Sequence, residues 1–287
     1  MAKKKAVSQS VGGRFATVGR KSTLKFRSAK DKFAVVREKV GPGVTIGKVL
    51  PSFITLCSTV LGMSAILWAG RGYFGRAVLL VIFAALCDML DGAAARRLKT
   101  TSKFGVELDS LSDVISFGVA PAFIMYYFSA YRIKAFGWIA ALVFVIAGVL
   151  RLARFNVMAG EERKTPEHWK NFFIGMPIPA GALMAMYPIA LFYTNGNMVF
   201  VSPQLGIAFL MFFAMMMVSR VPTFALKKAR LPSELVPYVL IVLIFTLALM
   251  FHHFWYVLSI LGVVYMLSIP WTIISFLKIK RLARGGR

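Results

Sequence analysis

The stretch FGRAVLLVIFAALCDMLDG, residues 74–92, is a nearly continuous apolar run that ends in two aspartates, Asp88 and Asp91. Its length is close to the roughly 20 residues that an α-helix needs to cross the hydrocarbon core of a bilayer. Carboxylates are costly to place in or near hydrocarbon, so acids at the end of such a run are functional candidates. The stretch therefore predicts a membrane helix that carries a site at one end.

The whole chain has the composition of an integral membrane protein. Of its 287 residues 58% are hydrophobic, more than a soluble domain of this length would carry. It has 35 Lys and Arg against 11 acidic residues, and its formal net charge is +24. In a soluble protein such a charge would indicate nucleic-acid binding, but in a membrane protein it reflects basic loops and attraction to anionic head groups. We therefore expect membrane lipids, and no nucleic acid, as partners.

Hydropathy predicts an all-α integral membrane fold with about eight transmembrane helices. The apolar runs are residues 51–70, 74–92, 105–130, 134–157, 174–194, 205–221, 235–251 and 254–276. They divide the chain into three regions. These are a basic arm at residues 1–50, a membrane domain at 51–230 that holds the site, and two additional helices with a basic tail at 231–287.

Basic residues fall almost entirely on one side of this arrangement. The other side holds only Arg71, Arg76, Arg132 and Lys134, against 31 on the first. Lys and Arg accumulate in cytoplasmic loops. The split predicts eight spans, both termini in the cytoplasm and a site at the cytoplasmic face, in a bacterial-type inner membrane.

The N-terminal arm carries 13 Lys and Arg and no long apolar core, so it does not resemble a secretory signal. Residues 15–40 mix Phe, Val and Leu with basic residues, which fits an amphipathic helix on an anionic membrane surface. A solvated tail fits equally well, and a transit peptide is a less favoured alternative. The role of the arm stays open.

Five of the 11 acidic residues fall between residues 88 and 113. Asp88 and Asp91 are three apart, and Asp109 and Asp113 are four apart, so each pair lies on one face of its helix. A tight connection would bring the two faces together. Because such close carboxylates repel one another, we expect a divalent cation that prefers oxygen ligands, Mg²⁺ or Mn²⁺. The alternative is that the acids pair with basic residues of the connecting loop, which are Arg96, Arg97, Lys99 and Lys103.

Two glycines and an arginine accompany the acids. Gly92 follows the first pair and Gly105 precedes the second, and both would let a substrate approach the helix backbone closely. Arg96 lies about one turn beyond Asp91 and is placed to hold a phosphate. The combination indicates a site for a phosphate-bearing substrate.

The segments DMLDGAAAR (residues 88–96) and GVELDSLSD (residues 105–113) resemble the CDP-alcohol phosphotransferase signature at every fixed position. That signature reads DxxDG, xxAR, eight residues, G, xxxD and xxxD. It covers 26 residues here, and the pattern of spans extends the resemblance to about residue 230. The resemblance implies six transmembrane helices around the site and an enzyme that transfers a phosphatidyl group from CDP-diacylglycerol to an alcohol.

The resemblance also implies roles for individual residues. Four aspartates would bind one or two Mg²⁺ or Mn²⁺ ions, and the last of them would also remove the proton of the acceptor hydroxyl; they are Asp88, Asp91, Asp109 and Asp113. A second group would contact the cytidine nucleotide and its pyrophosphate, and consists of Gly92, Ala95, Arg96 and Gly105.

Three further stretches favour L-serine as the acceptor. Residues 111–121 (LSDVISFGVAP), 151–156 (RLARFN) and 173–180 (FIGMPIPA) resemble the bacterial and archaeal phosphatidylserine synthases of that family. Serine carries a carboxylate and an ammonium group, so its site needs a cation and an anion or carbonyls. The candidates for binding the acceptor or a lipid phosphate are Arg151, Arg154, Asn156 and Glu107. The two arginines fit equally well as anchors of the positive-inside type.

Two other functions stay open. A phosphatidyltransferase that uses glycerol 3-phosphate or inositol phosphate would carry the same signature and would also use arginines. A membrane transporter would also hold carboxylates in the bilayer, but it predicts acids spread through the bilayer depth rather than gathered at one boundary.

Two further features of the resemblance concern the contacts of the nucleotide and the oligomeric state, and they do not change the expected enzyme class. Family members often begin the first span with Pro-Asn and a later Asn, whereas here Ser52 follows Pro51 and Ser58 takes the later position. We therefore expect altered contacts near the nucleotide. Family members are commonly homodimers, and the sequence does not decide whether this chain is one.

Overall fold

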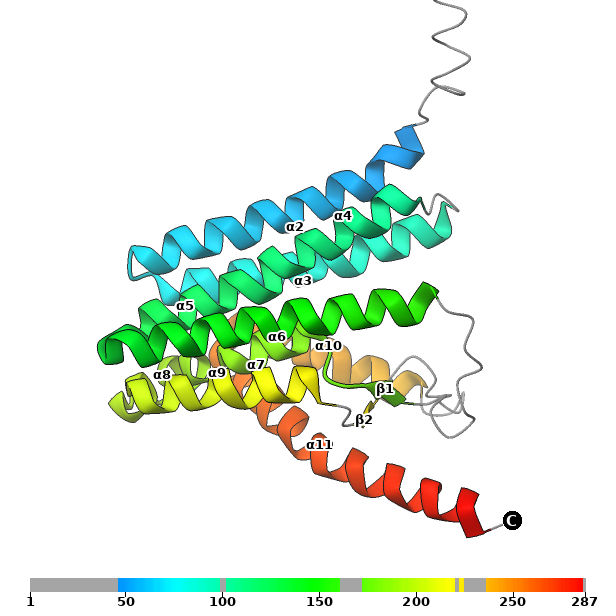
Figure 1. Cartoon of the computed structure of the whole chain (residues 1–287). Helices are drawn as coiled ribbons and strands as arrows, with labels where there is room; N and C mark the ends of the chain where they lie inside the picture. Colours follow the sequence, from blue (N-terminus) through cyan, green and yellow to red (C-terminus); the bar gives the residue numbers. More distant parts are fainter. Residues whose placement is uncertain (1–45, 99–101, 161–171, 220–221, 225–235, 286–287) are drawn as a thin grey trace, which may run out of the picture. The chain divides into compact units, whose positions relative to one another are not determined.

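The computed structural model describes residues 46–98, 102–160, 172–219, 222–224 and 236–285, most of which are helical (Figure 1). The α-helices are α2 (Ile46–Gly70), α3 (Phe74–Arg97), α4 (Lys103–Asp113), α5 (Ala120–Phe128), α6 (Lys134–Gly160), α7 (Ile178–Ala185), α8 (Tyr187–Asn195), α9 (Pro203–Val218), α10 (Val236–His252) and α11 (Phe254–Gly285). A π-helix, η1 (Val114–Val119), joins α4 to α5, and two 3-10 helices are η2 (Ala130–Ile133) and η4 (Met198–Val201). Most of the predicted basic arm, residues 1–45, lies outside the described residues.

Five helical segments of the described chain are long and apolar enough to cross a membrane. They are Val49–Gly70, Phe74–Arg97, Phe104–Phe128, Ala130–Met158 and Phe254–Ser275. The predicted runs 205–221 and 235–251 form the shorter apolar helices α9 and α10, and the run 174–194 is divided between α7 and α8. Each predicted run thus has a helical counterpart, and the chain is an integral membrane protein.

Close packing of α2 against its neighbours brings the signature segments together. α2 packs along α3, and α4, η1 and α5 also contact α2. On α2, Gly62 faces η1 so closely that a Cβ at this position would lie 2.8 Å from the Cα atom of Ser116. Small residues at such a contact let two helix backbones approach each other. The C-terminal end of α3 and the whole of α4 are therefore held beside α2.

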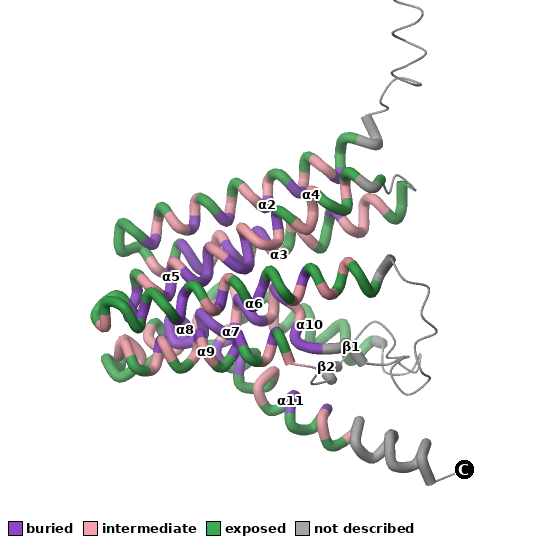
Figure 2. Tube along the Cα trace, in the orientation of Figure 1, coloured by how far each residue is buried: buried purple, intermediate pink, exposed green. Residues whose placement is uncertain are grey.

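The core lies deeper in the bundle, on the helices that follow the signature. Figure 2 shows buried residues concentrated on α5, α7 and α8, whereas α10 is exposed along most of its length. Buried aromatic side chains such as Phe117, Phe144 and Phe213 fill this core together with many alanines. The carboxylates lie at the end of α3 and along α4, on helices that pack against α2, and Asp91 is itself buried.

A short ribbon, which the sequence did not indicate, ties the chain before α7 to the chain after α9. β1 (Phe172–Ile174) pairs antiparallel with β2 (Pro222–Phe224). Gly175 follows β1 with φ +80°, where a Cβ would lie 2.8 Å from the carbonyl oxygen of Ser219. Only glycine takes this left-handed conformation at such close range without strain. The turn places Met176 against α6.

Candidate active site

Three of the four aspartates of the signature converge. Asp88 and Asp91 come from the last turns of α3 and Asp109 from α4, and one carboxylate oxygen of each lies within 4.8 Å of the others. Asp113, one turn beyond Asp109, is close enough to Asp88 for the two carboxyl groups to interact electrostatically. The three-residue and four-residue spacings thus put all four carboxyl groups on the facing sides of two adjacent helices. The alternative prediction was that the acids pair with basic residues of the connecting loop. Two of those basic residues cannot be placed, because Lys99 and the side chain of Lys103 lie outside the described residues.

This cluster has the chemistry of a divalent cation site. Three convergent carboxylates supply hard oxygen ligands, which Mg²⁺ and Mn²⁺ prefer. Asp91 is buried, and the Oγ1 atom of Thr55 lies 2.6 Å from its Oδ2 atom. A carboxylate fixed in this way presents its other oxygen in a defined direction. The residues present therefore fit a metal ion.

Hydroxyl groups of α2 form a buried polar seam against α3, α4 and η1. Thr59 donates to Ser112 (2.8 Å), and Ser112 donates to the carbonyl oxygen of Thr55 (3.0 Å). Ser58 donates to the carbonyl oxygen of Ala84 (3.1 Å), and Ser116 donates to that of Ser58 (3.0 Å). The seam sets the position of α2 relative to both acidic helices. The spacing of Thr55, Ser58 and Thr59 is a signal for these contacts in the sequence, because residues three and four apart share one face of a helix.

A cleft of about 160 Å³ opens beside the cluster, between α2, the end of α3 and the start of α4. All four residues expected to contact the nucleotide line it, together with Asp91 and Asp109; they are Gly92, Ala95, Arg96 and Gly105. Arg96 is exposed and extends over Gly92, where a Cβ would lie 3.3 Å from its Nη1 atom. The cleft therefore joins a phosphate-binding side chain to the carboxylates.

The start of α2 completes the cleft. Pro51, Ser52 and Thr55 line it, so the serine that replaces the common asparagine does reach the expected nucleotide side. Ser58, which replaces the later asparagine, is instead buried in the polar seam. Ser102 caps the first turn of α4 by accepting a hydrogen bond from the Gly105 backbone N–H (3.0 Å).

The candidates for binding the acceptor are placed differently from one another. Arg151 Nε donates to the carbonyl oxygen of Met176, and Arg154 donates to the carbonyl oxygens of Val218 (3.1 Å) and Ser219 (3.3 Å). Both arginines thus fasten α6 to the segments before α7 and after α9. Arg151 is half-buried and close enough to Asp113 for an electrostatic interaction.

The remaining two candidates lie on or against α4. Asn156 donates from Nδ2 to the hydroxyl of Ser110 (2.9 Å), which follows Asp109 directly. Glu107 is exposed. Of the four candidates, Arg151 and Asn156 are therefore the ones that the fold brings toward the carboxylate cluster.

Comparisons with known proteins agree with this geometry. The family model described as CDP-alcohol phosphatidyltransferase matches residues 48–218, from the third residue of α2 to the end of α9. A protein from Helicobacter pylori is 38% identical over 197 residues, which cover 67% of this chain and 79% of the relative. One from Bacillus subtilis is 35% identical over 162 residues, 56% of this chain and 85% of the relative. A third, from Mycobacterium leprae, is 34% identical over 187 residues, 65% of this chain and 62% of the relative.

Each of these three relatives is named CDP-diacylglycerol–serine O-phosphatidyltransferase. The family match spans more than half of the chain and contains every residue of the carboxylate cluster and the adjoining cleft. The helices α10 and α11 lie outside the matched region. This chain belongs to the CDP-alcohol phosphatidyltransferase family.

Proposed function

We propose that the chain transfers the phosphatidyl group of CDP-diacylglycerol to the hydroxyl group of L-serine, giving phosphatidylserine and CMP. The observation that carries the proposal is the carboxylate cluster beside a cleft lined by Arg96 and the signature glycines. The serine acceptor is supported by the names of the relatives from three bacterial species. The alternative within the family is an acceptor such as glycerol 3-phosphate or inositol phosphate.

The cluster of Asp88, Asp91 and Asp109 would hold the divalent cation, and Asp113 follows one turn further along α4 as the proposed general base. When bound, Mg²⁺ or Mn²⁺ would neutralise the pyrophosphate and stabilise the charge that develops in the transition state. The chain's own contribution is to orient these carboxylates. Thr55 does this for Asp91 through the 2.6 Å contact.

In the proposed reaction the nucleotide end of the donor lies in the cleft. The backbone at Gly92 and Gly105 and the small side chain of Ala95 allow the nucleotide to approach closely, and Arg96 pairs with its phosphates. Asp113 accepts the proton of the serine hydroxyl as general base. The serine oxygen attacks the lipid-proximal phosphorus, the bond from that phosphorus to the CMP oxygen breaks, and CMP leaves with the electron pair.

The acceptor is held on the side of the cluster that faces α6. Arg151, half-buried and within electrostatic range of Asp113, supplies a cation for the serine carboxylate or for a lipid phosphate. Asn156 orients polar groups from its position against Ser110. Arg154 acts by holding the end of α9 through Val218 and Ser219, and Glu107 would help with the ammonium group only from an exposed position.

The same proposal gives the enzyme an orientation. The acidic ends of α3 and α4 lie on the side that carries most of the basic loops, so we place the active site at the cytoplasmic face of a bacterial-type inner membrane, with both termini cytoplasmic. A lipid donor would then enter from the bilayer and a water-soluble acceptor from the cytosol.

The acceptor assignment is tested by CMP release from purified protein with CDP-diacylglycerol and Mn²⁺. L-serine, glycerol 3-phosphate and inositol phosphate are offered separately. We expect release with serine and at least about a hundredfold less with the other two, because a site that pairs buried polar groups with one acceptor rejects others strongly. Release with glycerol 3-phosphate or inositol phosphate alone would keep the phosphatidyltransferase mechanism and overturn the serine assignment.

A second expected result concerns Thr55, which acts through Asp91. Replacing Thr55 with Val removes the hydroxyl and keeps the shape, and we expect kcat to fall about tenfold to a hundredfold, as for other partners of metal-binding carboxylates. Thr55→Ser, which keeps the hydroxyl, should restore most of the rate. The matched control is Thr246→Val on α10, whose hydroxyl only donates to its own helix at Val242. A loss of protein stability without a change in Mn²⁺ dependence would assign Thr55 a purely structural role.

A further inference from the structure

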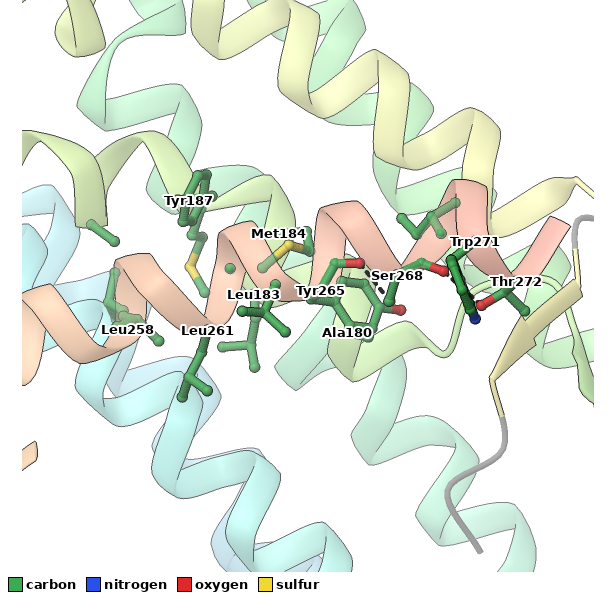
Figure 3. Close-up of a pocket in the computed structure, with 16 residues that line it drawn as sticks. Ala180, Leu183, Met184, Tyr187, Leu258, Leu261, Tyr265, Ser268, Trp271 and Thr272 are labelled. Atoms are coloured by element: carbon green, nitrogen blue, oxygen red, sulfur yellow. Dashed lines mark hydrogen bonds between the residues drawn. The ribbon is translucent and has the colours of Figure 1, made fainter. Parts of the chain in front are cut away.

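A second cavity, of about 650 Å³, lies between α7, α8 and α11 (Figure 3). Its lining is mostly apolar and includes Ala180, Leu183 and Met184 on α7, and Leu258, Leu261 and Val264 on α11. α11 lies outside the region that matches the family model. The family match therefore includes the α7 and α8 walls of the cavity and leaves out its α11 wall.

The shape of this cavity follows the helix axis. On α11 its lining runs from Leu258 to Thr272, which at 1.5 Å per residue corresponds to roughly 20 Å of helix. One leaflet contributes about half of the roughly 30 Å hydrocarbon core of a bilayer. We call this elongated cavity the slot. Its length along a membrane helix and its apolar lining fit a single acyl chain.

Hydroxyl groups line the half of the slot toward the C-terminal end of α11. Tyr265, Ser268 and Thr272 lie on one face of α11, and Figure 3 shows Tyr265 and Ser268 beside each other in the lining. The hydroxyls of Ser268 and Thr272 donate to carbonyl oxygens of their own helix (2.6 and 2.7 Å). The Tyr265 hydroxyl is buried and has no hydrogen-bond partner among the described residues. A buried hydroxyl left unpaired is costly, so this one points to a ligand with an acceptor oxygen.

Arg151 relates the polar half of the slot to the carboxylate cluster, because it interacts with a residue of each. The guanidinium group of Arg151 lies within electrostatic range of both Tyr265 and Asp113. The Nε atom of Arg151 donates a hydrogen bond to the carbonyl oxygen of Met176, which lies just before α7 in the chain. Residues of α7 line the slot. One cation thus interacts electrostatically with both the unpartnered hydroxyl and the proposed general base. The matching ligand has an apolar tail, an ester or phosphate oxygen, and negative charge toward the cluster.

We propose that this slot holds one acyl chain of the CDP-diacylglycerol donor, with an ester or phosphate oxygen of the donor at Tyr265 and Arg151. The assignment rests on the proposed function for the identity of the donor. It commits to the donor rather than to a bulk bilayer lipid because Arg151, which interacts with Asp113, is held by the Met176 carbonyl oxygen just before α7, and α7 lines the slot. It gives α11 a part in substrate binding.

The test is a comparison of two donors on full-length protein in detergent. Ala180→Phe places a ring in the slot, and we expect KM for dipalmitoyl CDP-diacylglycerol to rise about tenfold, the loss for about two methylenes leaving an apolar site. KM for the dihexanoyl donor should stay within about twofold, because its short chains do not fill the slot. The matched control is Ala208→Phe, at an exposed position of α9, which should change neither value. Val264→Trp, at a position 58% exposed, repeats the test with less demand on packing.

A second readout does not depend on the acceptor. Thermal stabilisation of the protein by each donor with Mn²⁺, measured without any alcohol, should fall in Ala180→Phe for the dipalmitoyl donor and not for the dihexanoyl donor. Serine turnover that fails while this difference persists would overturn the proposed function and leave the slot assignment standing. Equal changes for both donors, or none for either, would overturn the slot assignment. So would loss of co-purified phospholipid from the variant with no change in donor preference, which would assign the slot to bulk lipid.

Discussion

Replacing Asp113 with Asn lowers the rate of CMP release by about a hundredfold to ten-thousandfold, the range that a general base contributes. The amide keeps the size of the side chain but cannot accept the proton of the acceptor hydroxyl. Because Asp113 stands one turn beyond the three convergent carboxylates, Mn²⁺ and the donor should still bind. The measurement is single-turnover CMP release at saturating donor and serine, beside a Mn²⁺ titration.

This result separates base chemistry from metal binding. A variant that loses turnover and keeps its Mn²⁺ affinity supports Asp113 as the base. Turnover within about twofold of the unchanged protein would exclude that role and direct attention to the other carboxylates. A parallel loss of Mn²⁺ affinity would instead assign Asp113 to the metal site, which its contact with Asp88 makes the natural alternative.

Replacing Asp91 with Asn is expected to lower the Mn²⁺ affinity more than replacing Asp113 with Asn does. Asp91 lies at the centre of the site, since it belongs to the convergent cluster, lines the cleft and contacts Thr55. We expect both the apparent Mn²⁺ affinity and the rate to fall by about a hundredfold or more, beyond the range seen when only a supporting partner is lost. Binding of Mn²⁺ without substrate, followed by electron paramagnetic resonance, measures the first effect directly.

Chelation supplies the complementary experiment on the unchanged protein. EDTA should abolish CMP release, and Mn²⁺ or Mg²⁺ added in excess should restore it. Asp113→Asn is the matched control for Asp91→Asn, because both replace an aspartate by its amide within one cluster. Equal Mn²⁺ affinity in Asp91→Asn and in the unchanged protein would contradict a metal-binding role for Asp91.

The parts of the site that could be predicted are those that depend on local spacing. Residues three or four apart on a helix share a face whatever the rest of the chain does, so the convergence of Asp88, Asp91 and Asp109 follows from two helices and a short connection. The apolar runs likewise predicted the helices, because backbone groups in hydrocarbon must be paired within the segment. These expectations required no knowledge of how distant helices pack.

The parts that could not be predicted depend on contacts between distant segments. Thr55 reaches Asp91 only because α2 packs along α3, and the ribbon of β1 and β2 pairs residues about fifty positions apart. In the sequence Arg151 and Arg154 fit basic residues that anchor a cytoplasmic loop. In the structure each donates a hydrogen bond to a carbonyl oxygen of a distant segment, Arg151 to Met176 and Arg154 to Val218. The break between α7 and α8 could have been predicted from the local sequence. Pro188 lies in the first turn of α8, and a proline disfavours helical conformation in the residue that precedes it.

The π-helix after Asp113 has a consequence for how the third span can change over time. In a regular α-helix each residue turns the chain by about 100°, so the acidic face of α4 would fix the orientation of every residue in α5. The wide turn at Val114–Val119 contains an i→i+5 hydrogen-bonding step and resets that phase between the two halves. The half that carries Asp109 and Asp113 and the half that packs the core are therefore offset in rotation from the phase that an unbroken α-helix would give. A deletion of one residue within Val114–Val119 would remove this offset and turn the carboxylates relative to the core face of α5.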